Sequence, residues 1–194
     1  MVLAMKKHSV ILCCLGLCSL YLSGACAAER DSVRRSDLFG FGAVSVSDGI
    51  EMVVSSGVDG VTVVAGGRMM PLLKIEVDGD TLKIGVRQQP EGGRTFRRKE
   101  RATVYVPRRE YRSFTVADGA ALRLPEDYRA DILRIGAVSG GNVQGGVHCT
   151  ALTLSASSGS TVRLEGVCDS LVTEAAGGAQ VVAALQMVNP LTVI

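Results

Sequence analysis

The chain has 194 residues, of which 47% are hydrophobic and only 4% are aromatic, with 23 glycines and no tryptophan. Its formal net charge of +2 excludes a protein that coats nucleic acid through an overall excess of basic residues. Many small and branched aliphatic residues with few aromatic ones are typical of a narrow β-solenoid, whose interior admits only such side chains.

The first 28 residues predict an export signal. Lys6 and Lys7 precede an apolar run from Val10 to Leu22, and small residues follow as far as Ala28. This is the order of segments in a secretory signal, which is cleaved from the mature protein. Without the two lysines the remaining chain has no formal net charge. About 165 residues are then left, the size of one ordinary domain.

Two alternatives for this segment stay open. Residues 10–28 are long enough to span a membrane if the signal is not cleaved. Cys26 follows Ser23-Gly24-Ala25, an order similar to a relaxed bacterial lipobox, and is therefore a candidate for lipidation. In that case the only membrane contact would be an N-terminal lipid anchor.

Residues 29–38 are polar and charged and predict a linker, after which a single domain extends over residues 39–194. Short runs of alternating apolar and polar residues follow the linker and predict strands. They are Ala43–Val46, Ile50–Val54, Val61–Ala65, Leu73–Val77, Leu82–Val86, Ala102–Val106 and Ser113–Val116.

Asp-Gly pairs separate several of these strands and predict hairpins, because both residues tolerate the positive φ of a tight turn. The pairs are Asp48-Gly49, Asp59-Gly60 and Asp78-Gly79. The third pair joins Leu73–Val77 to Leu82–Val86, and both arms alternate as an antiparallel pair with one wet face does. We therefore expect an irregular, hairpin-containing N-terminal half.

From Phe114 onward, residues of one kind recur at intervals of 19. The apolar and small-residue columns are Phe114/Leu133/Leu152/Leu171, Val116/Ile135/Leu154/Thr173, Leu124/Val143/Val162/Val181, Ala137/Ala156/Ala175 and Gly140/Gly159/Gly178. A fixed period of this length indicates a solenoid, and the apolar–polar alternation within each repeat indicates strands. The fold class predicted is all-β: a parallel, single-stranded β-helix with about four rungs of 19 residues.

The C-terminal end of this coil has no evident cap. Leu191–Val193 could begin a further rung, but the sequence ends there. Unpaired strand edges attract other strands. We therefore expect that the last rung can mediate oligomerisation.

A basic segment is the most prominent surface feature. Between Arg87 and Arg112 there are nine basic and three acidic residues. The candidate contacts to an anionic ligand are Arg94, Arg97, Arg98, Lys99 and Arg101. Arginine forks suit carboxylates, sulfates and phosphates, and outside the cytoplasm that chemistry favours acidic glycans over nucleic acid. The alternative is a charged hairpin tip that only aids solubility and protects an edge strand.

Cys149 and Cys168 also lie 19 residues apart, which predicts that they occupy adjacent rungs about 4.8 Å apart. That spacing lies within the Cα separation of disulfides, and an exported protein meets an oxidising compartment. A disulfide between two rungs is one prediction. Two free, buried thiols in one apolar column are the other.

The residues expected of an enzyme are scarce. His148 is the only histidine after the export signal, and its neighbour Cys149 points to the opposite side of a strand. The acidic residues concentrate in Asp118, Glu126, Asp127 and Asp131, and arginines interleave with them, as on a solvated ion-pair surface. We predict no catalytic, cofactor-binding or metal-binding residues and no enzymatic activity.

Several segments resemble one family. They are Phe41–Glu51, Gly79–Ile84, Val138–Asn142 and Ala156–Ser160. Together they are similar to the DUF2807 group, the auto-transporter adhesin head (GIN) domains of exported Bacteroidetes proteins. The Gly-Ile-Asn of that group's name is here Gly49-Ile50-Glu51. The resemblance implies a right-handed β-helix similar to pectin-lyase-like folds, no known catalytic residues and a role in cell-surface adhesion.

The sequence thus predicts an exported protein of the periplasm, outer membrane or cell surface of a Gram-negative bacterium, acting as an adhesin or surface-binding module. Its expected partner is an acidic glycan or another surface protein. Two alternatives stay open, an enzyme acting on polysaccharide and a structural envelope accessory anchored through Cys26.

Overall fold

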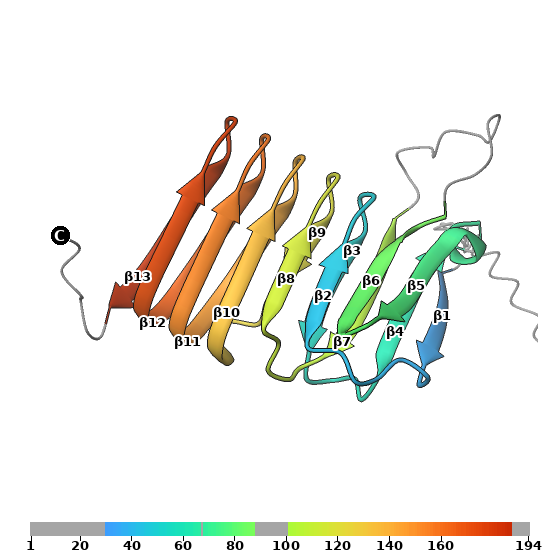
Figure 1. Cartoon of the computed structure of the whole chain (residues 1–194). Coiled ribbons are helices and arrows are strands. Elements are labelled where there is room, and N and C mark those ends of the chain that lie inside the picture. The colour runs from blue at the N-terminus through green and yellow to red at the C-terminus, as the bar shows by residue number, and fades with distance from the viewer. Residues whose placement is uncertain (1–29, 67, 88–100, 188–194) are drawn as a thin grey trace, which may run out of the picture.

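The computed structural model describes residues 30–66, 68–87 and 101–187. Within these ranges the chain forms thirteen strands and one 3₁₀ turn, η1 (Met70–Leu72). The strands stack into a flattened coil with tight turns aligned along one edge (Figure 1). The predicted all-β solenoid is confirmed. No helix in the described ranges has the length and apolar character needed to cross a membrane.

Each coil of the regular region consists of a strand, a tight turn and a second strand on the opposite face. The six strands of this region are β8 (Ser113–Val116), β9 (Ala121–Arg123), β10 (Tyr128–Ala137), β11 (Asn142–Ala156), β12 (Thr161–Ala175) and β13 (Gln180–Met187). β11 and β12 are long because each bends round the corner opposite the turns and contributes to two successive coils. All their pairings are parallel.

The tight turns require a left-handed backbone. Ser158 and Gly159 have φ values of 54° and 71°, and the equivalent Ser139 and Gly140 have 50° and 76°. The hydrogen-bond ladder continues through these turns, since Gly140 N donates to Ser158 O at 3.0 Å. Glycine suits such a position because it has no Cβ to clash there.

The predicted ladder of like side chains is confirmed. Leu133 lies opposite Leu152, and Leu152 lies opposite Leu171. Leu133 and Leu152 are 0% and 1% exposed. Successive windings therefore bury the same positions against each other, as the 19-residue spacing predicts.

The first coil departs from that spacing. Phe114 pairs with Ile135 and Leu122 pairs with Val143, both 21 residues apart. The columns predicted for Phe114, Val116 and Leu124 are therefore wrong at these three positions. The difference arises at the corner Pro125–Asp127, between β9 and β10, which holds two more residues than the corners that follow. Strand pairing tolerates this because the insertion lies outside the ladder.

The N-terminal half contains a coil of its own. Its strands lie close to their predicted bounds: β2 (Ala43–Val46), β3 (Glu51–Ser55), β4 (Val61–Gly66), β5 (Leu73–Asp78), β6 (Thr81–Val86) and β7 (Ala102–Pro107). β2 pairs in parallel with β8 and with β6, and β3 pairs in parallel with β9 and β7. The parallel stack therefore begins at Ala43 rather than near Phe114.

Only one of the three predicted Asp-Gly hairpins forms. Asp78-Gly79 joins β5 to β6, which pair antiparallel. Asp48-Gly49 instead makes a coil turn, with φ values of 61° and 69°, because β2 and β3 lie on opposite faces. Asp59-Gly60 connects β3 to β4, and β7 lies between those strands. The hairpin predictions at these two pairs are wrong.

The predicted linker over residues 29–38 is also wrong in part. Residues 30–35 form β1 (Arg30–Arg35), which pairs antiparallel with β4 along its whole length. Antiparallel strands can leave one face in water, so a charged segment is compatible with an edge strand.

The core is a narrow tube of aliphatic side chains with one aromatic cluster. Phe41, Tyr111, Phe114 and Tyr128 follow each other with ring centroids 5.4–5.9 Å apart. Tyr128 Oη accepts from Tyr111 N at 2.8 Å and donates to Arg109 O at 3.1 Å. Burial raises the pKa of both tyrosines. Tyr128 directly follows the Pro125–Asp127 insertion, so one ring of this cluster lies beside that corner.

Candidate binding groove

A hollow lies on the outer side of β9, β11, β12 and β13. Its volume is about 790 Å³, within the range of small-ligand pockets. We call this hollow the outer groove. Arg123, Gln144, Arg163 and Val182 form one of its sides. These four residues are Cα partners on neighbouring strands, so they rise as a ladder at steps of about 4.8 Å.

The floor of the outer groove consists of glycine backbone. Gly145, Gly146 and Gly166 all line it. A Cβ on Gly146 would overlap the carbonyl oxygen of Glu126, and one on Gly166 would overlap that of Val147. Glycine is therefore required here because the coils approach closely, and the missing side chains leave the hollow.

The opposite side of the groove carries carboxylates. Glu165 lies on β12 between Gly146 and Ala184 of the neighbouring strands, and Glu126 lies in the corner insertion. Arg108 holds that corner through an ion pair to Asp127, with 2.9 Å between Nη1 and Oδ1. The same contact lowers the pKa of the Asp127 carboxyl. The insertion that shifts the repeat thus forms a fixed end of the groove.

The groove contains charges of both signs. The Arg123 guanidinium donates to Glu51 on β3, and 56% of the Arg123 side chain remains exposed. Arg163 is exposed and forms no ion pair with a described residue. The side chains therefore offer guanidinium and amide donors opposite carboxylate acceptors, without a large net charge.

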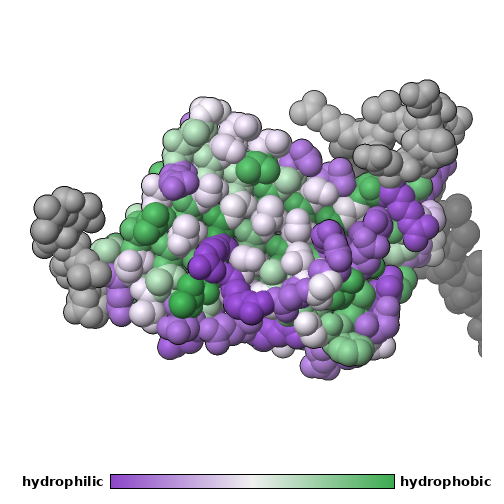
Figure 2. Space-filling view, in the orientation of Figure 1, coloured by the Kyte–Doolittle hydropathy of each residue, from purple (hydrophilic) through white to green (hydrophobic). Residues whose placement is uncertain are grey.

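The other face of the coil, which we call the flat face, has a smaller hollow of about 230 Å³ beside Ser45, Lys83 and Gly85. The flat face is formed by β6, β2 and β8 and by residues 132–137, 151–156 and 170–175, and small residues of intermediate hydropathy cover much of its centre (Figure 2). Thr153 and Ser155 lie on it, as the alternation predicts. Ser160 does not face solvent: it is 1% exposed, and its Oγ donates to Ala137 O at 2.9 Å.

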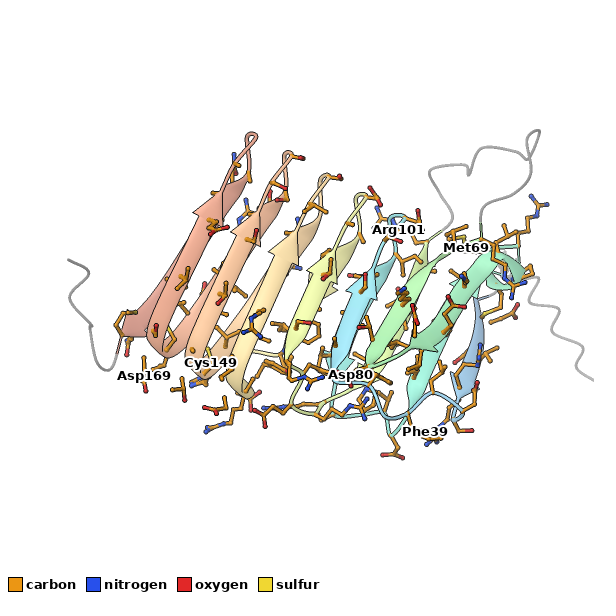
Figure 3. The ribbon with its side chains drawn as sticks, viewed as in Figure 1. Phe39, Met69, Asp80, Arg101, Cys149 and Asp169 are labelled. Carbon is orange, nitrogen blue, oxygen red and sulfur yellow. The ribbon has the colours of Figure 1, made fainter. Side chains whose placement is uncertain are left out.

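Most of the predicted anionic-ligand residues lie outside the described ranges. These are Arg94, Arg97, Arg98 and Lys99, and the candidate lipidation site Cys26 lies outside them too. Arg101 is exposed just before β7, toward the end of the molecule opposite the last coil (Figure 3). It contributes nothing to the outer groove.

Cys149 and Cys168 are Cα partners on adjacent coils, as the spacing predicts. Both are free thiols in the structure, so the predicted disulfide is not formed there. The Cys168 thiol is directed toward the next coil, where its Sγ lies 3.7 Å from Met187 Sδ. Oxidation of the pair remains a prediction.

Sequence reasoning missed the outer groove. One signal in the sequence could have located it: three of its residues recur at the 19-residue interval, namely Gln144, Arg163 and Val182. Arg123 lies 21 residues before Gln144 and is therefore absent from that register. The Gly145-Gly146 pair and Gly166 were the other available signal, since neighbouring coils place them together.

A parallel β-solenoid with a groove along its stacked strands is the architecture of an extended binding scaffold. The chain belongs to the DUF2807 family, "putative auto-transporter adhesin, head GIN domain", which it matches over residues 40–193. A comparison with curated proteins gave no match.

Two solved structures share the fold. A "putative adhesin" from Parabacteroides distasonis is 17% identical with a TM-score of 0.68, and the match covers 81% of this chain and 66% of that one. A "putative lipid binding protein" from the same species is 14% identical with a TM-score of 0.53, covering 79% of this chain and 75% of that one. The chain therefore spans about two thirds of the length of the first relative.

Proposed function

We propose that this protein is an exported, non-catalytic module of the cell envelope that binds glycans through the outer groove and acts in adhesion. The groove is the observation that supports this most: a hollow of about 790 Å³ with a regular ladder of polar side chains. Membership in a family described as adhesin heads supports the same role.

The chemistry of the groove favours a hydroxyl-rich saccharide without strong net charge. Arg123, Gln144 and Arg163 supply hydrogen-bond donors, and Glu126 and Glu165 supply acceptors. Sugar hydroxyls both donate and accept, so they can satisfy both sides of the groove. A polyanion would meet the two carboxylates at close range, which disfavours it here.

The basic residues of the second candidate site give the protein a separate means of attachment. Arg94, Arg97, Arg98, Lys99 and Arg101 suit an acidic glycan through charge-assisted hydrogen bonds. We propose this site as an accessory one, which strengthens adhesion by holding a surface at two places.

The proposed location is the periplasm or outer surface of a Gram-negative bacterium, reached through the export signal in residues 1–28. The related structures come from a bacterium of the same kind of envelope. Lipidation of Cys26 would hold the domain on a membrane. Mass spectrometry of the mature N-terminus distinguishes an acylated Cys26 from cleavage ahead of Ala28.

The last coil is the proposed contact for another protein. Val182 and Met187 on β13 are 56% and 40% exposed, and the outer edge of β13 has no strand partner among the described residues. Exposed apolar side chains beside an unpaired strand edge favour association with another strand or coil end.

A glycan array tests the function directly. We expect the mature protein to bind neutral oligosaccharides, and Arg163→Ala to weaken that binding about tenfold, the equivalent of about 1.4 kcal/mol. Thr153→Ala on the flat face is the matched control and should bind as the wild type does. Equal binding by Arg163→Ala and the wild type would exclude the outer groove. Release of new reducing ends from a bound polysaccharide would contradict the non-catalytic assignment.

A further inference from the structure

Three sulfur atoms follow each other in one column at the corner opposite the tight turns. Cys149 on β11 is the Cα partner of Cys168 on β12, and Cys168 is the partner of Met187 on β13. Neighbouring strands are about 4.8 Å apart, so three coils present sulfur at successive steps. Ala130 on β10 occupies the preceding position of this column and is 8% exposed.

The spacing of two of these sulfurs is that of two ligands on one metal ion. Cys168 Sγ and Met187 Sδ are 3.7 Å apart. Two metal–sulfur bonds of about 2.3 Å at a tetrahedral angle separate their sulfurs by about 3.8 Å. The pair could therefore close on a metal ion with little movement.

Cys149 completes the set. The Cys149 pKa is raised to about 11, chiefly by burial and then by the charges of Cys168 and Asp169. Cys149 and Cys168 are Cα partners, so their side chains occupy neighbouring positions of the same column. Burial, and then the charge of Asp169, raise the pKa of the Cys168 thiol as well. Cys149 and Asp169 lie at the same end of the coils in Figure 3.

The donor set selects the kind of metal ion. Thiolate and thioether sulfur are soft ligands, which favour Cu(I) over harder divalent ions. His148 is an unsuitable fourth ligand, because adjacent residues on a strand point to opposite sides. Among the described residues, no group of three or more His, Cys, Asp and Glu side chains is placed to hold a metal ion. This site has two such side chains, Cys149 and Cys168, and its third ligand is the Met187 thioether.

The column can be reached from solvent. Met187 is 40% exposed at the last coil, whereas Cys168 is 0% exposed beneath it. Cys149 is half-buried. An ion would enter past the flexible Met187 side chain and meet the thiols behind it, and Ala130 would close the column on the other side.

We propose that Cys149, Cys168 and Met187 form a binding site for a soft monovalent metal ion, with Cu(I) as the natural occupant. Both thiols release their protons to solvent as the two metal–thiolate bonds form, and the metal keeps its oxidation state. The Met187 thioether binds through a lone pair without losing a proton. A Cys149–Cys168 disulfide would use the same thiols, so oxidised protein cannot bind the ion.

Anaerobic titration of the reduced, full-length protein with Cu(I) against bathocuproine disulfonate tests the proposal. We expect one Cu(I) per chain and, by X-ray absorption, sulfur ligands at about 2.3 Å. Direct ligands should matter at least as much as outer-shell residues, so Cys149→Ser and Cys168→Ala should each weaken binding at least about 100-fold. Met187→Leu, which preserves side-chain volume, should weaken it about tenfold.

Met70→Leu, in the 3₁₀ turn at the other end of the molecule, is the matched control and should bind as the wild type does. Circular dichroism on each variant shows whether the fold is retained, and Cys149→Ser and Met187→Leu alter positions that are only partly buried. Unchanged Cu(I) affinity in folded Cys149→Ser or Met187→Leu would overturn the proposal. Binding dominated by nitrogen or oxygen ligands would overturn it too.

Discussion

The two halves of the molecule differ in how they cover the exposed edges of their strands. The N-terminal half mixes parallel coils with antiparallel pairs, in which β1–β4–β7 and the β5–β6 hairpin cover one end of the tube. The C-terminal half stacks parallel coils in register and has no such cover in the described ranges. Val162 is 0% exposed, whereas its column partner Val181 on the last coil is only partly buried. Stability should therefore decline toward the last coil.

The largest expected effect comes from the closest approach between coils. Gly146→Ala would bring a Cβ into the carbonyl group of Glu126, and we expect a loss of about 3 kcal/mol of unfolding free energy. Gly66→Ala in the N-terminal half has open space around the new Cβ and should be close to neutral. Urea unfolding measures both. A neutral Gly146→Ala would mean that the coils are less tightly stacked than the comparison requires.

Truncation within one column measures how burial declines between adjacent coils. Val162→Ala should cost about 2 kcal/mol, because the valine is fully buried. Val181→Ala should cost less than about 1 kcal/mol, because Val181 on the last coil is only partly buried. Equal costs in denaturant unfolding would show that something covers the C-terminal end in solution.

The aromatic cluster of Phe41, Tyr111, Phe114 and Tyr128 predicts that the folded protein loses stability at alkaline pH. The tyrosine pKa is raised in the folded state, so stabilisation is present below the unfolded value of about 10 and is lost as the pH rises above it. Tyr128→Phe should cost about 1 kcal/mol at pH 8, since it removes two hydrogen bonds. It should also flatten the loss of stability between pH 9 and about 11. Parallel pH curves for the two proteins would contradict this reasoning.

The smallest effect concerns the turns. Ser158 holds φ at 54°, which costs a non-glycine residue about 1 kcal/mol. Ser158→Gly removes that strain but adds chain entropy to the unfolded state, so we expect a net gain of a few tenths of a kcal/mol. Ser157→Gly, with no positive φ to relieve, should instead lose about 0.5 kcal/mol. Thermal unfolding distinguishes the two signs.

Much of the fold could be predicted because the local pattern and the tertiary contacts agree. The seven strands read from alternation between residues 43 and 116 all form, and Leu133, Leu152 and Leu171 stack as their spacing implies. Asp-Gly pairs were less informative. A two-residue sequence sets the positive φ of a turn, but not whether the strands it joins become neighbours.

The candidate groove depended on longer-range information. Arg123 joins Gln144 and Arg163 only because Pro125–Asp127 adds two residues at a corner and shifts the register of everything before it. An insertion of this kind leaves each strand's own pattern intact. It can be located only when the pairing of neighbouring coils is known.

The sequence alone determined the class of architecture, since a period of 19 residues with two-residue alternation can bury its apolar side only by stacking coils. It also placed Cys149 beside Cys168. The tertiary structure alone decided which faces of the coils are flat or grooved, and which residues meet across the corner. Those outcomes depend on the register between strands. Backbone hydrogen bonds between parallel strands can form in several registers, and side-chain packing selects one of them.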